Sequence, residues 1–360
     1  MTVPFTANES SVMKDVRNWS DLIVGLMDHR HMDRGTAAWA MDQIMSGDVP
    51  DVTMAAFLVA HHGKGETVEE ITGLVSAMME HAVSIEGLDG YVDIVGTGGD
   101  RAKTVNISST ASFVIAGSGV PVAKHGNRAT SSASGSADVF EHLGLALDLT
   151  PEQTAAVAEK VGMAFLFANV YHPSMRFIAP VRKQIAVPSA FNILGPLANP
   201  AGTRSTAIGV SDPAMAPLIA GVLAERGDSA LVFRSQDGLD ELSNTAVNDV
   251  WEVRGGQIEH SVFDATSLGI ARVTKDDLRG GDPAYNASVI RRTLDGETGP
   301  VRDAVLLNAA AALVAASDDA EAPLADRLSA QFQRAQETLD AGKAAAKLDQ
   351  LVEESAAASA

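Results

Sequence analysis

The sequence predicts an α/β protein, with a large domain that has a mainly parallel central sheet flanked by helices, plus a small all-α domain. Between Leu22 and Val83, apolar residues recur every three or four positions, as they do along the buried face of a helix. After Gly90, short apolar segments alternate with helical ones, which is typical of parallel strands joined by right-handed crossovers. We therefore expect a loose N-terminal tail (1–18), a small helical domain (19–88) and a large α/β domain (89–360).

Four helical segments are expected in the small domain. Their sequences are LIVGLMDHR (22–30), TAAWAMDQIMSG (36–47), VTMAAFLVAHHG (52–63) and TVEEITGLVSAMMEHAV (67–83). Gly47, Gly63 and Gly65 stand at or near the ends of these segments, where glycine commonly terminates a helix.

Five strands are expected in the large domain, because each is a short apolar run followed by turn or helix signals. They are Val92–Val95, Val120–Ala123, Ala164–Ala168, Thr206–Val210 and Ala230–Phe233. One of the intervening helices carries a strong start signal, since Thr150, Pro151 and Gln153 form a capping box with proline at the first helical position. Ligands of such sheets bind at the carboxyl ends of the strands.

Composition restricts the function classes. The chain has 360 residues, a net charge of −19 and no cysteine, so it has no disulfide framework or thiolate site and fits a reducing cytoplasm. A protein that binds a nucleic-acid backbone normally presents a basic face, so we expect no nucleic-acid partner. We also expect no membrane partner, because the longest apolar run, 304–316, is too short to span a bilayer, and no signal peptide.

A glycine-dense turn follows the first expected strand, in the segment DIVGTGGDRAKTVNISS (93–109). Gly96, Gly98 and Gly99 carry no Cβ, so backbone amides there can approach the oxygens of an anion closely. The stretch 106–119 is expected to be helical, and its N-terminus would add a partial positive charge. The same spacing also occurs in plain tight turns, so this segment by itself leaves both interpretations open.

A second polar loop, KHGNRATSSASGSAD (124–138), follows the second expected strand. Lys124, His125 and Arg128 supply cationic groups, and the hydroxyl and amide side chains around them supply neutral donors. Two such loops favour a ligand with phosphate groups at both ends, because a single phosphate needs only one. A solvated serine-rich linker is the alternative, although linkers rarely follow a buried strand directly.

Three further segments contribute candidates. In YHPSMRFIAPVRK (171–183), Arg176 and Arg182 offer guanidinium groups that suit a carboxylate, or surface ion pairs. The segment FNILGPLANP (191–200) predicts a rigid structural loop. In DGLDEL (237–242), Asp240 and Glu241 are oxygen ligands of the kind Mg²⁺ prefers, and the alternative is a solvated surface pair.

With these segments in place, the chain resembles the anthranilate phosphoribosyltransferases of tryptophan biosynthesis from about Asp21 to Leu351. The matching segments are GETVEEI (65–71), DIVGTGGD (93–100), TVNISS (104–109), KHGNRATSSASGSADVFEHLG (124–144), YHPSMRFIAPVR (171–182), FNILGPLANP (191–200), DGLDEL (237–242) and AVLLNAAAAL (304–313). The resemblance implies a homodimer formed through the helical domain, to which part of 170–190 returns.

The resemblance also implies the site residues. Phosphoribosyl pyrophosphate (PRPP) would be held by Gly96, Gly99, Asp100, Thr104, Asn106, Ile107, Ser108, Ser109, Lys124, His125, Gly126, Asn127, Arg128, Ala129, Thr130, Ser131, Ser132 and Ser136. Anthranilate would meet Gly96, Asn127 and Arg182. Two Mg²⁺ ions per chain would be held by Ser108, Asp240 and Glu241.

Several positions depart from the family pattern. Arg101 stands where a further glycine is usual, and Lys103 adds a second positive charge. Ser109 and Ala198 replace threonines, and Ala133 replaces a lysine of some relatives. The first departure predicts a phosphate loop that closes differently.

The implied reaction is attack of the anthranilate amine on the anomeric carbon of PRPP, with loss of diphosphate. It needs no covalent enzyme intermediate, and no serine or cysteine triad is apparent. A pyrimidine nucleoside phosphorylase and a non-catalytic nucleic-acid-binding relative are the alternatives. A dinucleotide-binding oxidoreductase is disfavoured because Gly96–Asp100 lacks the GxGxxG spacing.

Overall fold

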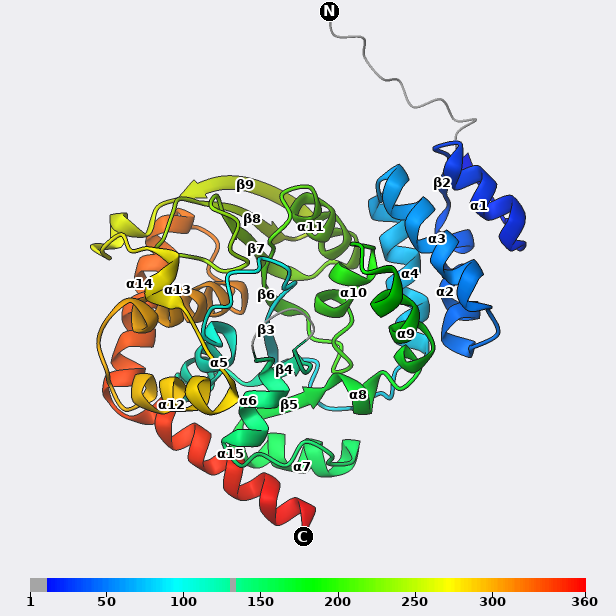
Figure 1. Cartoon of the computed structure of the whole chain (residues 1–360). Coiled ribbons are helices and arrows are strands. Elements are labelled where there is room, and N and C mark those ends of the chain that lie inside the picture. Colours follow the sequence, from blue (N-terminus) through cyan, green and yellow to red (C-terminus); the bar gives the residue numbers. More distant parts are fainter. Residues whose placement is uncertain (1–11, 130–133) are drawn as a thin grey trace, which may run out of the picture. The chain divides into compact units, whose positions relative to one another are not determined.

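The computed structural model describes residues 12–129 and 134–360, and these form two compact units. The helical unit contains the described residues up to Ala82 together with His172–Ala198. The sheet unit contains Val83–Tyr171 and Asn199–Ala360. Both units are drawn in Figure 1.

The helical unit is built from helices contributed by both of its chain segments. They are α1 (Trp19–Met27), α2 (Arg34–Ser46), α3 (Asp51–Lys64), α4 (Val68–Glu80), α9 (Met175–Ile185) and α10 (Phe191–Leu197). Helix α9 packs against α2 and α3, and α10 packs against α4. Thr67 and Glu70 form a reciprocal capping box at the start of α4, so the chain itself satisfies the first amides of that helix.

Two segments of the helical unit differ from the expectation. Val12–Met13, expected within the tail, forms strand β1 and pairs in parallel with β2 (His31–Met32), and Met13 is buried. Residues 191–197, expected as a loop, form α10 with Pro196 inside it. Pro196 has no N–H to continue the helical hydrogen bonds, and α10 ends one residue later, at Leu197.

The sheet unit has a seven-stranded sheet within its described residues, in the order β5-β4-β3-β6-β7-β8-β9. Its strands are β3 (Val92–Gly96), β4 (Val122–Gly126), β5 (Met163–Phe167), β6 (Ser205–Gly209), β7 (Ser229–Ser235), β8 (Asn248–Arg254) and β9 (Gln257–Phe263). The first five are parallel, whereas β8 and β9 are antiparallel to their neighbours. This confirms the mainly parallel sheet, and the two antiparallel strands extend it by an unpredicted hairpin.

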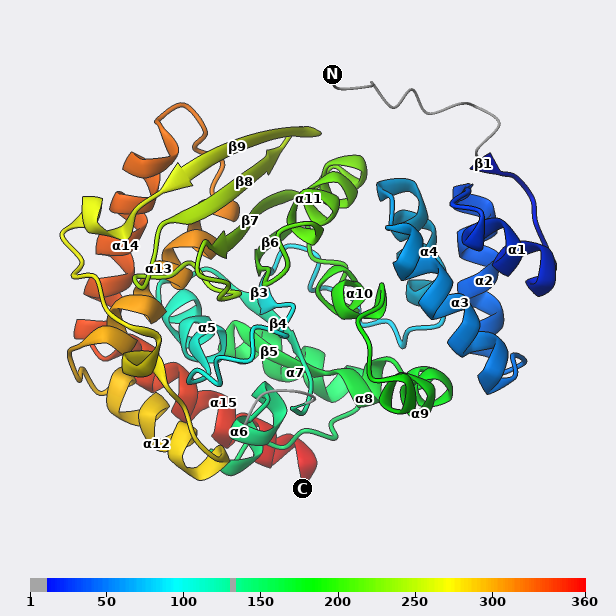
Figure 2. The same ribbon diagram turned by 45° about the horizontal axis from the view of Figure 1, so that its top comes forward.

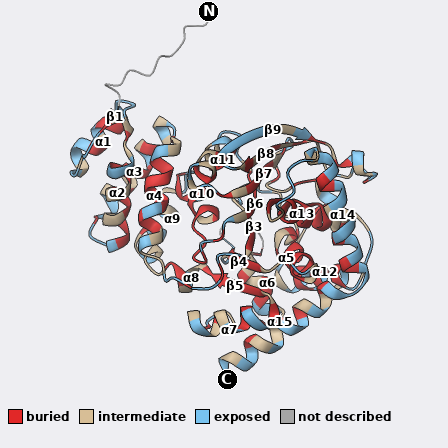
Figure 3. Ribbon diagram, turned by 180° about the vertical axis from the view of Figure 1, so that it is seen from behind, coloured by how far each residue is buried: buried red, intermediate tan, exposed pale blue. Residues whose placement is uncertain are grey.

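Helices flank the sheet as predicted (Figure 2). They are α5 (Ile107–Gly117), α6 (Ser136–His142), α7 (Pro151–Val161), α8 (Ala168–Tyr171), α11 (Met215–Arg226), α12 (Pro283–Leu294), α13 (Pro300–Ala315), α14 (Leu324–Asp340) and α15 (Lys343–Ser359), with 3-10 turns at Ala265–Leu268 and Lys275–Leu278. Helix α13 is almost entirely buried (Figure 3), which explains why its sequence is apolar all round. The capping box at Thr150 is present as predicted.

Within the described ranges, no helix is long and apolar enough to cross a membrane.

Candidate functional site

The three loops expected to form the site leave the same edge of the sheet. They follow β3, β4 and β7, which run parallel, so their carboxyl ends lie together. We call them the phosphate loop (97–106), the second loop (127–135) and the acidic loop (236–242).

The acidic loop packs directly against the glycines that end two strands. A Cβ on Gly96 would lie 2.4 Å from Asp240 Oδ2, and one on Gly209 would lie 1.8 Å from the Asp240 carbonyl oxygen. Gly98 N donates a hydrogen bond to Asp240 Oδ2 at 2.7 Å. The glycines that end β3 and β6 therefore leave room for Asp240 of this same chain, which sequence reasoning did not foresee.

Asp100, Asp240 and Glu241 bring three carboxylates together. Burial raises the pKa of Asp240 to about 7, and the neighbouring charge of Asp100 adds to this effect. Burial also raises the pKa of Glu241 well above its ordinary value, with further contributions from Asp240 and Asp100. Asp100 Oδ2 is buried with no hydrogen-bond partner among the described residues. Such mutual repulsion favours a bound cation, which would relieve it.

Lys124 and His125 lie within strand β4, which corrects the expectation that they begin a loop. The strand covers Val122–Gly126 because its residues pair in register with β5 as far as Gly126 and Phe167. Lys124 is only 2% exposed, and its Nζ donates to Ile94 O at 2.7 Å and to Ser108 Oγ at 3.3 Å. Its ammonium therefore lies beneath the site, beside one of the predicted metal ligands.

Asp93 is a functional candidate that the sequence reasoning did not single out. Its Oδ1 accepts from His125 N at 3.2 Å, and its Oδ2 accepts from Asn199 Nδ2 at 2.8 Å. Burial raises the pKa of Asp93 to about 6, although the charge of Lys124 opposes the shift. Burial likewise lowers the pKa of Lys124. An acidic residue inside an otherwise apolar strand was the available signal.

The phosphate loop has an unusual backbone at the two residues that depart from the family pattern. Arg101 and Lys103 have φ angles of +58° and +56°, a region that favours glycine. The loop then joins residues 278–280, where Val105 N donates to Leu278 O at 2.9 Å and Gly280 N donates to Lys103 O at 2.8 Å. The loop thus takes left-handed backbone angles at both Arg101 and Lys103.

At the start of α5, the predicted residues divide into two groups. Asn106 is the N-cap residue, and its Nδ2 donates to Ser134 O at 3.0 Å, which links the phosphate loop to the second loop. Ile107 and Ser109 are each 1% exposed. The surrounding protein therefore covers these two residues almost completely, backbone included.

The second loop is tied at both ends by Asp138. Its Oδ2 accepts from Ala129 N and from Gly135 N, each at 2.9 Å. Arg128 pairs with Asp138 at 3.1 Å and with Glu141 at 2.8 Å, so its charge is already compensated by two carboxylates. Three predicted PRPP ligands of this loop, Thr130, Ser131 and Ser132, lie outside the described residues, as does the departure at Ala133.

Gly126 and Ser136 are in close contact across the second loop. A Cβ on Gly126 would lie 2.1 Å from Ser136 Oγ. Ser136 Oγ also donates to Asn127 O at 3.4 Å. The structure therefore brings these three predicted residues together.

Arg182 belongs to the helical unit, whereas Gly96 and Asn127 belong to the sheet unit. It lies in the last turn of α9 with its guanidinium carbon 5.4 Å from the centre of the Phe191 ring. Burial lowers the pKa of Arg182 from its ordinary value. A half-buried guanidinium on an aromatic face is well suited to a planar anion.

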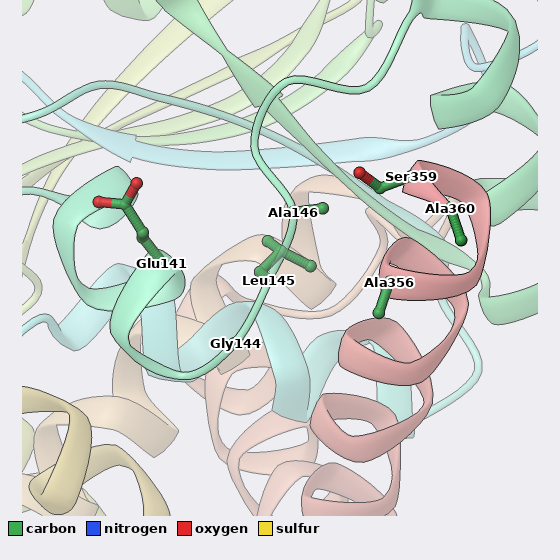
Figure 4. Close-up of a pocket in the computed structure, with 7 residues that line it drawn as sticks. All are labelled: Glu141, Gly144, Leu145, Ala146, Ala356, Ser359 and Ala360. Atoms are coloured by element: carbon green, nitrogen blue, oxygen red, sulfur yellow. The ribbon is translucent and has the colours of Figure 1, made fainter.

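A pocket of 430 Å³ lies elsewhere, between the end of α6 with the segment that follows it and the end of α15 (Figure 4). Its lining residues are Glu141, Gly144, Leu145, Ala146, Ala356, Ser359 and Ala360. None of the predicted ligand-binding residues lines it, so we assign the site from the converging loops instead. Within 12–129 and 134–360, no group of three or more His, Asp or Glu side chains is arranged to hold a metal by itself.

Comparisons with known proteins agree with this geometry. Residues 20–82 match the helical bundle domain of a glycosyl transferase family, and residues 88–345 match the a/b domain of that family. The chain is 51% identical over 345 residues to the anthranilate phosphoribosyltransferase of Arthrobacter sp. (strain FB24), covering 96% of this chain and 98% of the relative. It is 54% identical over 336 residues to that of Streptomyces avermitilis, covering 93% and 95%.

The solved structures point the same way. The anthranilate phosphoribosyltransferase from Thermus thermophilus has a TM-score of 0.86 and 38% identity, covering 93% of this chain and 99% of that one. The Saccharomyces cerevisiae enzyme, in complex with PRPP and Mg, has a TM-score of 0.85 at 23% identity, covering 94% and 98%, and so shares the fold. The chain therefore belongs to the glycosyl transferase family and, within it, to the anthranilate phosphoribosyltransferases.

Proposed function

We propose that this chain transfers the 5-phosphoribosyl group of PRPP to the amine of anthranilate, giving N-(5-phosphoribosyl)anthranilate and diphosphate in L-tryptophan biosynthesis. The supporting observation is the convergence of the phosphate loop and the acidic loop at one edge of a parallel sheet, with Asp240 against Gly96. This convergence and the sequence relatives favour phosphoribosyl transfer over phosphorolysis of a nucleoside and over nucleic-acid binding.

The proposed PRPP site follows from the two loops. The phosphate loop and the start of α5 would supply Gly96, Gly99, Asp100, Thr104, Asn106, Ile107, Ser108 and Ser109. Strand β4 and the second loop would supply residues 124–132, with Ser136 nearby. The proposed anthranilate contacts are Gly96, Asn127 and Arg182, with the Arg182 guanidinium binding the carboxylate.

Two Mg²⁺ ions per chain would be held by Ser108, Asp240 and Glu241. The raised pKa values of both carboxylates support a cation here, and Mg²⁺ usually takes one or two carboxylates plus waters and phosphate oxygens. The ions, when bound, would neutralise the charge that develops on the leaving diphosphate. Within the described residues no all-protein metal cage is present, which agrees with sites completed by the substrate.

The roles of the chain's own residues are to position the substrates and stabilise charge. Amides of the phosphate loop would orient the leaving diphosphate so that the anthranilate nitrogen faces the anomeric carbon. The C–N bond forms as the C–O bond to diphosphate breaks, and the nitrogen then loses a proton. An aryl amine is unprotonated at neutral pH, so the reaction does not need a strong general base.

The proposed homodimer forms through the helical unit. Val24 and Met27 of α1 are 55% and 68% exposed, and Val52 and Val59 of α3 are 76% and 51% exposed. Helices α1 and α3 pack side by side, so these side chains offer an apolar surface to a second copy. Met27→Asp should shift the species seen by light scattering towards the monomer.

A cytoplasmic location is proposed on the absence of cysteine.

The central experiment follows anthranilate fluorescence with purified protein, Mg²⁺ and PRPP. We expect fluorescence to fall only when all components are present, with omission of PRPP as the control. Unchanged fluorescence would refute phosphoribosyl transfer to anthranilate. Release of free base from a pyrimidine nucleoside and phosphate would instead establish the phosphorylase alternative.

A further inference from the structure

Two asparagine side chains, the buried Asn286 and the half-buried Asn106, form a hydrogen-bonded chain at the end of the phosphate loop. Asn286, in the second turn of α12, has no exposed surface and reaches residues of two other segments. Its Oδ1 accepts from Gly281 N at 2.8 Å, and its Nδ2 donates to Asn106 Oδ1 at 2.8 Å. Asn106 Nδ2 in turn donates to Ser134 O at 3.0 Å.

The groups at the two ends of this hydrogen-bonded chain fix the orientation of both side-chain amides. A backbone N–H can only donate, so Gly281 requires the oxygen of Asn286 to face it. The NH₂ group of Asn286 then faces Asn106, so Asn106 must turn its side-chain oxygen towards Asn286. The backbone carbonyl of Ser134 can only accept, so it favours the same orientation of Asn106.

Asn106 therefore presents its NH₂ group on the side of the second loop. One N–H bonds to Ser134 O, and the other has no partner within residues 12–129 and 134–360, so it can donate to a ligand oxygen. We infer that Asn286 is a positioning residue for PRPP, because it holds the Asn106 amide with its donor side turned to the diphosphate site. This inference rests on the proposed function, in which Asn106 contacts PRPP.

Asn286→Asp is the decisive variant because it keeps the size of the side chain. One carboxylate oxygen still accepts from Gly281, but the other faces Asn106 and requires a donor. Asn106 must turn over, which points its carbonyl oxygen at Ser134 O and at the diphosphate. We expect the Kd for PRPP, measured by calorimetry, and the KM for PRPP to rise about 10-fold or more, with the KM for anthranilate little changed.

The pH dependence separates positioning from general structural damage. In Asn286→Asp, the new carboxyl group donates to Asn106 again once it is protonated, and burial raises the pKa of such a group. The ratio of variant to wild-type Kd should therefore shrink as the pH falls from 8 to 6. Asn286→Ala supplies the control, because it weakens PRPP binding by a ratio that does not change with pH.

Two outcomes would overturn the inference: an unchanged Kd in Asn286→Asp, or a ratio that is independent of pH. If Asn286→Asp does not fold, Asn286→Ala decides, since equal rises in both KM values would also refute it. Inorganic diphosphate with Mg²⁺ serves as a second binding probe. A wild-type protein that does not turn over anthranilate refutes the proposed function, while diphosphate binding still tests the Asn286 inference.

Discussion

Asp240 lies so close to Gly96 that a Cβ on the glycine would stand 2.4 Å from the Asp240 carboxylate. The end of β3 and the acidic loop are thus one packed arrangement, and the carboxylate is held by Gly98 N at 2.7 Å. Any side chain at position 96 displaces a proposed metal ligand.

Gly96→Ala should lower kcat/KM by about 100-fold, because moving an active-site group by about 1 Å can cost that much. The Mg²⁺ concentration needed for half-maximal activity should rise at the same time. The measurement is a Mg²⁺ titration of the fluorescence assay. Gly90→Ala is the matched control, since a Cβ there would meet no atom within 4 Å. An unchanged Mg²⁺ requirement in Gly96→Ala would count against the metal assignment.

Asp240→Asn with Glu241→Gln should abolish the Mg²⁺ requirement or the activity.

The pKa of Asp240 is raised to about 7 from 3.8, so without metal the folded protein keeps a proton that the unfolded chain has lost. That stabilisation is complete below pH 3.8 and disappears as the pH rises to about 7.

We therefore expect the melting temperature of the metal-free protein to fall as the pH rises through this window. The fall should be smaller in the double variant, in which these two carboxyls no longer titrate. Mg²⁺ should raise the melting temperature more at pH 8 than at pH 6. Equal effects of Mg²⁺ at both pH values would contradict the proposed site.

Arg101→Gly should stabilise the protein by about 1 kcal/mol, because Arg101 has a φ of +58° that costs a non-glycine residue about that much. Thermal or denaturant unfolding measures the effect. Arg101→Ala separates backbone from charge, since alanine keeps the unfavourable φ and removes the guanidinium. If both variants have the same stability, backbone strain is not the cause.

Arg182→Ala should raise the KM for anthranilate at least 10-fold while the KM for PRPP changes little, as expected if the guanidinium binds the aryl carboxylate. Arg176→Ala is the matched control, because Arg176 likewise stacks on a phenylalanine. Its guanidinium carbon lies 4.6 Å from the ring centre of Phe177 in α9. Equal rises in both KM values would remove Arg182 from the aryl site.

Glu70→Gln should lower the free energy of unfolding by about 3 kcal/mol, because it breaks a buried ionic network. Burial would raise the pKa of Glu70, but His61 and Lys64 outweigh it and lower the pKa to about 2. The resulting stabilisation is present above pH 4.5 and is lost as the pH falls towards 2. Acid unfolding of the variant should therefore be less steep, with exposed Glu69→Gln as the control.

The sequence by itself determined the fold class, because the spacing of apolar residues and the composition of a segment are local properties. Alternating apolar strands and helices predicted the parallel sheet, and Thr150, Pro151 and Gln153 predicted a helix start that the structure contains. The glycine-dense turn and the Asp240 and Glu241 pair were also visible as motifs. The β8 and β9 hairpin was missed, since β8 is only half-buried, β9 is mostly exposed, and both strands carry many polar residues.

Only the tertiary structure decided which of these residues meet. Lys124 became a buried strand residue because register with β5 extends β4 to Gly126. Asp93, Asn199 and Asn286 acquired their partners from segments 32 to 180 residues away in the chain. Hydrogen bonds and charge repulsion depend on distances of a few ångströms in space, which sequence spacing does not encode once the chain has folded back on itself.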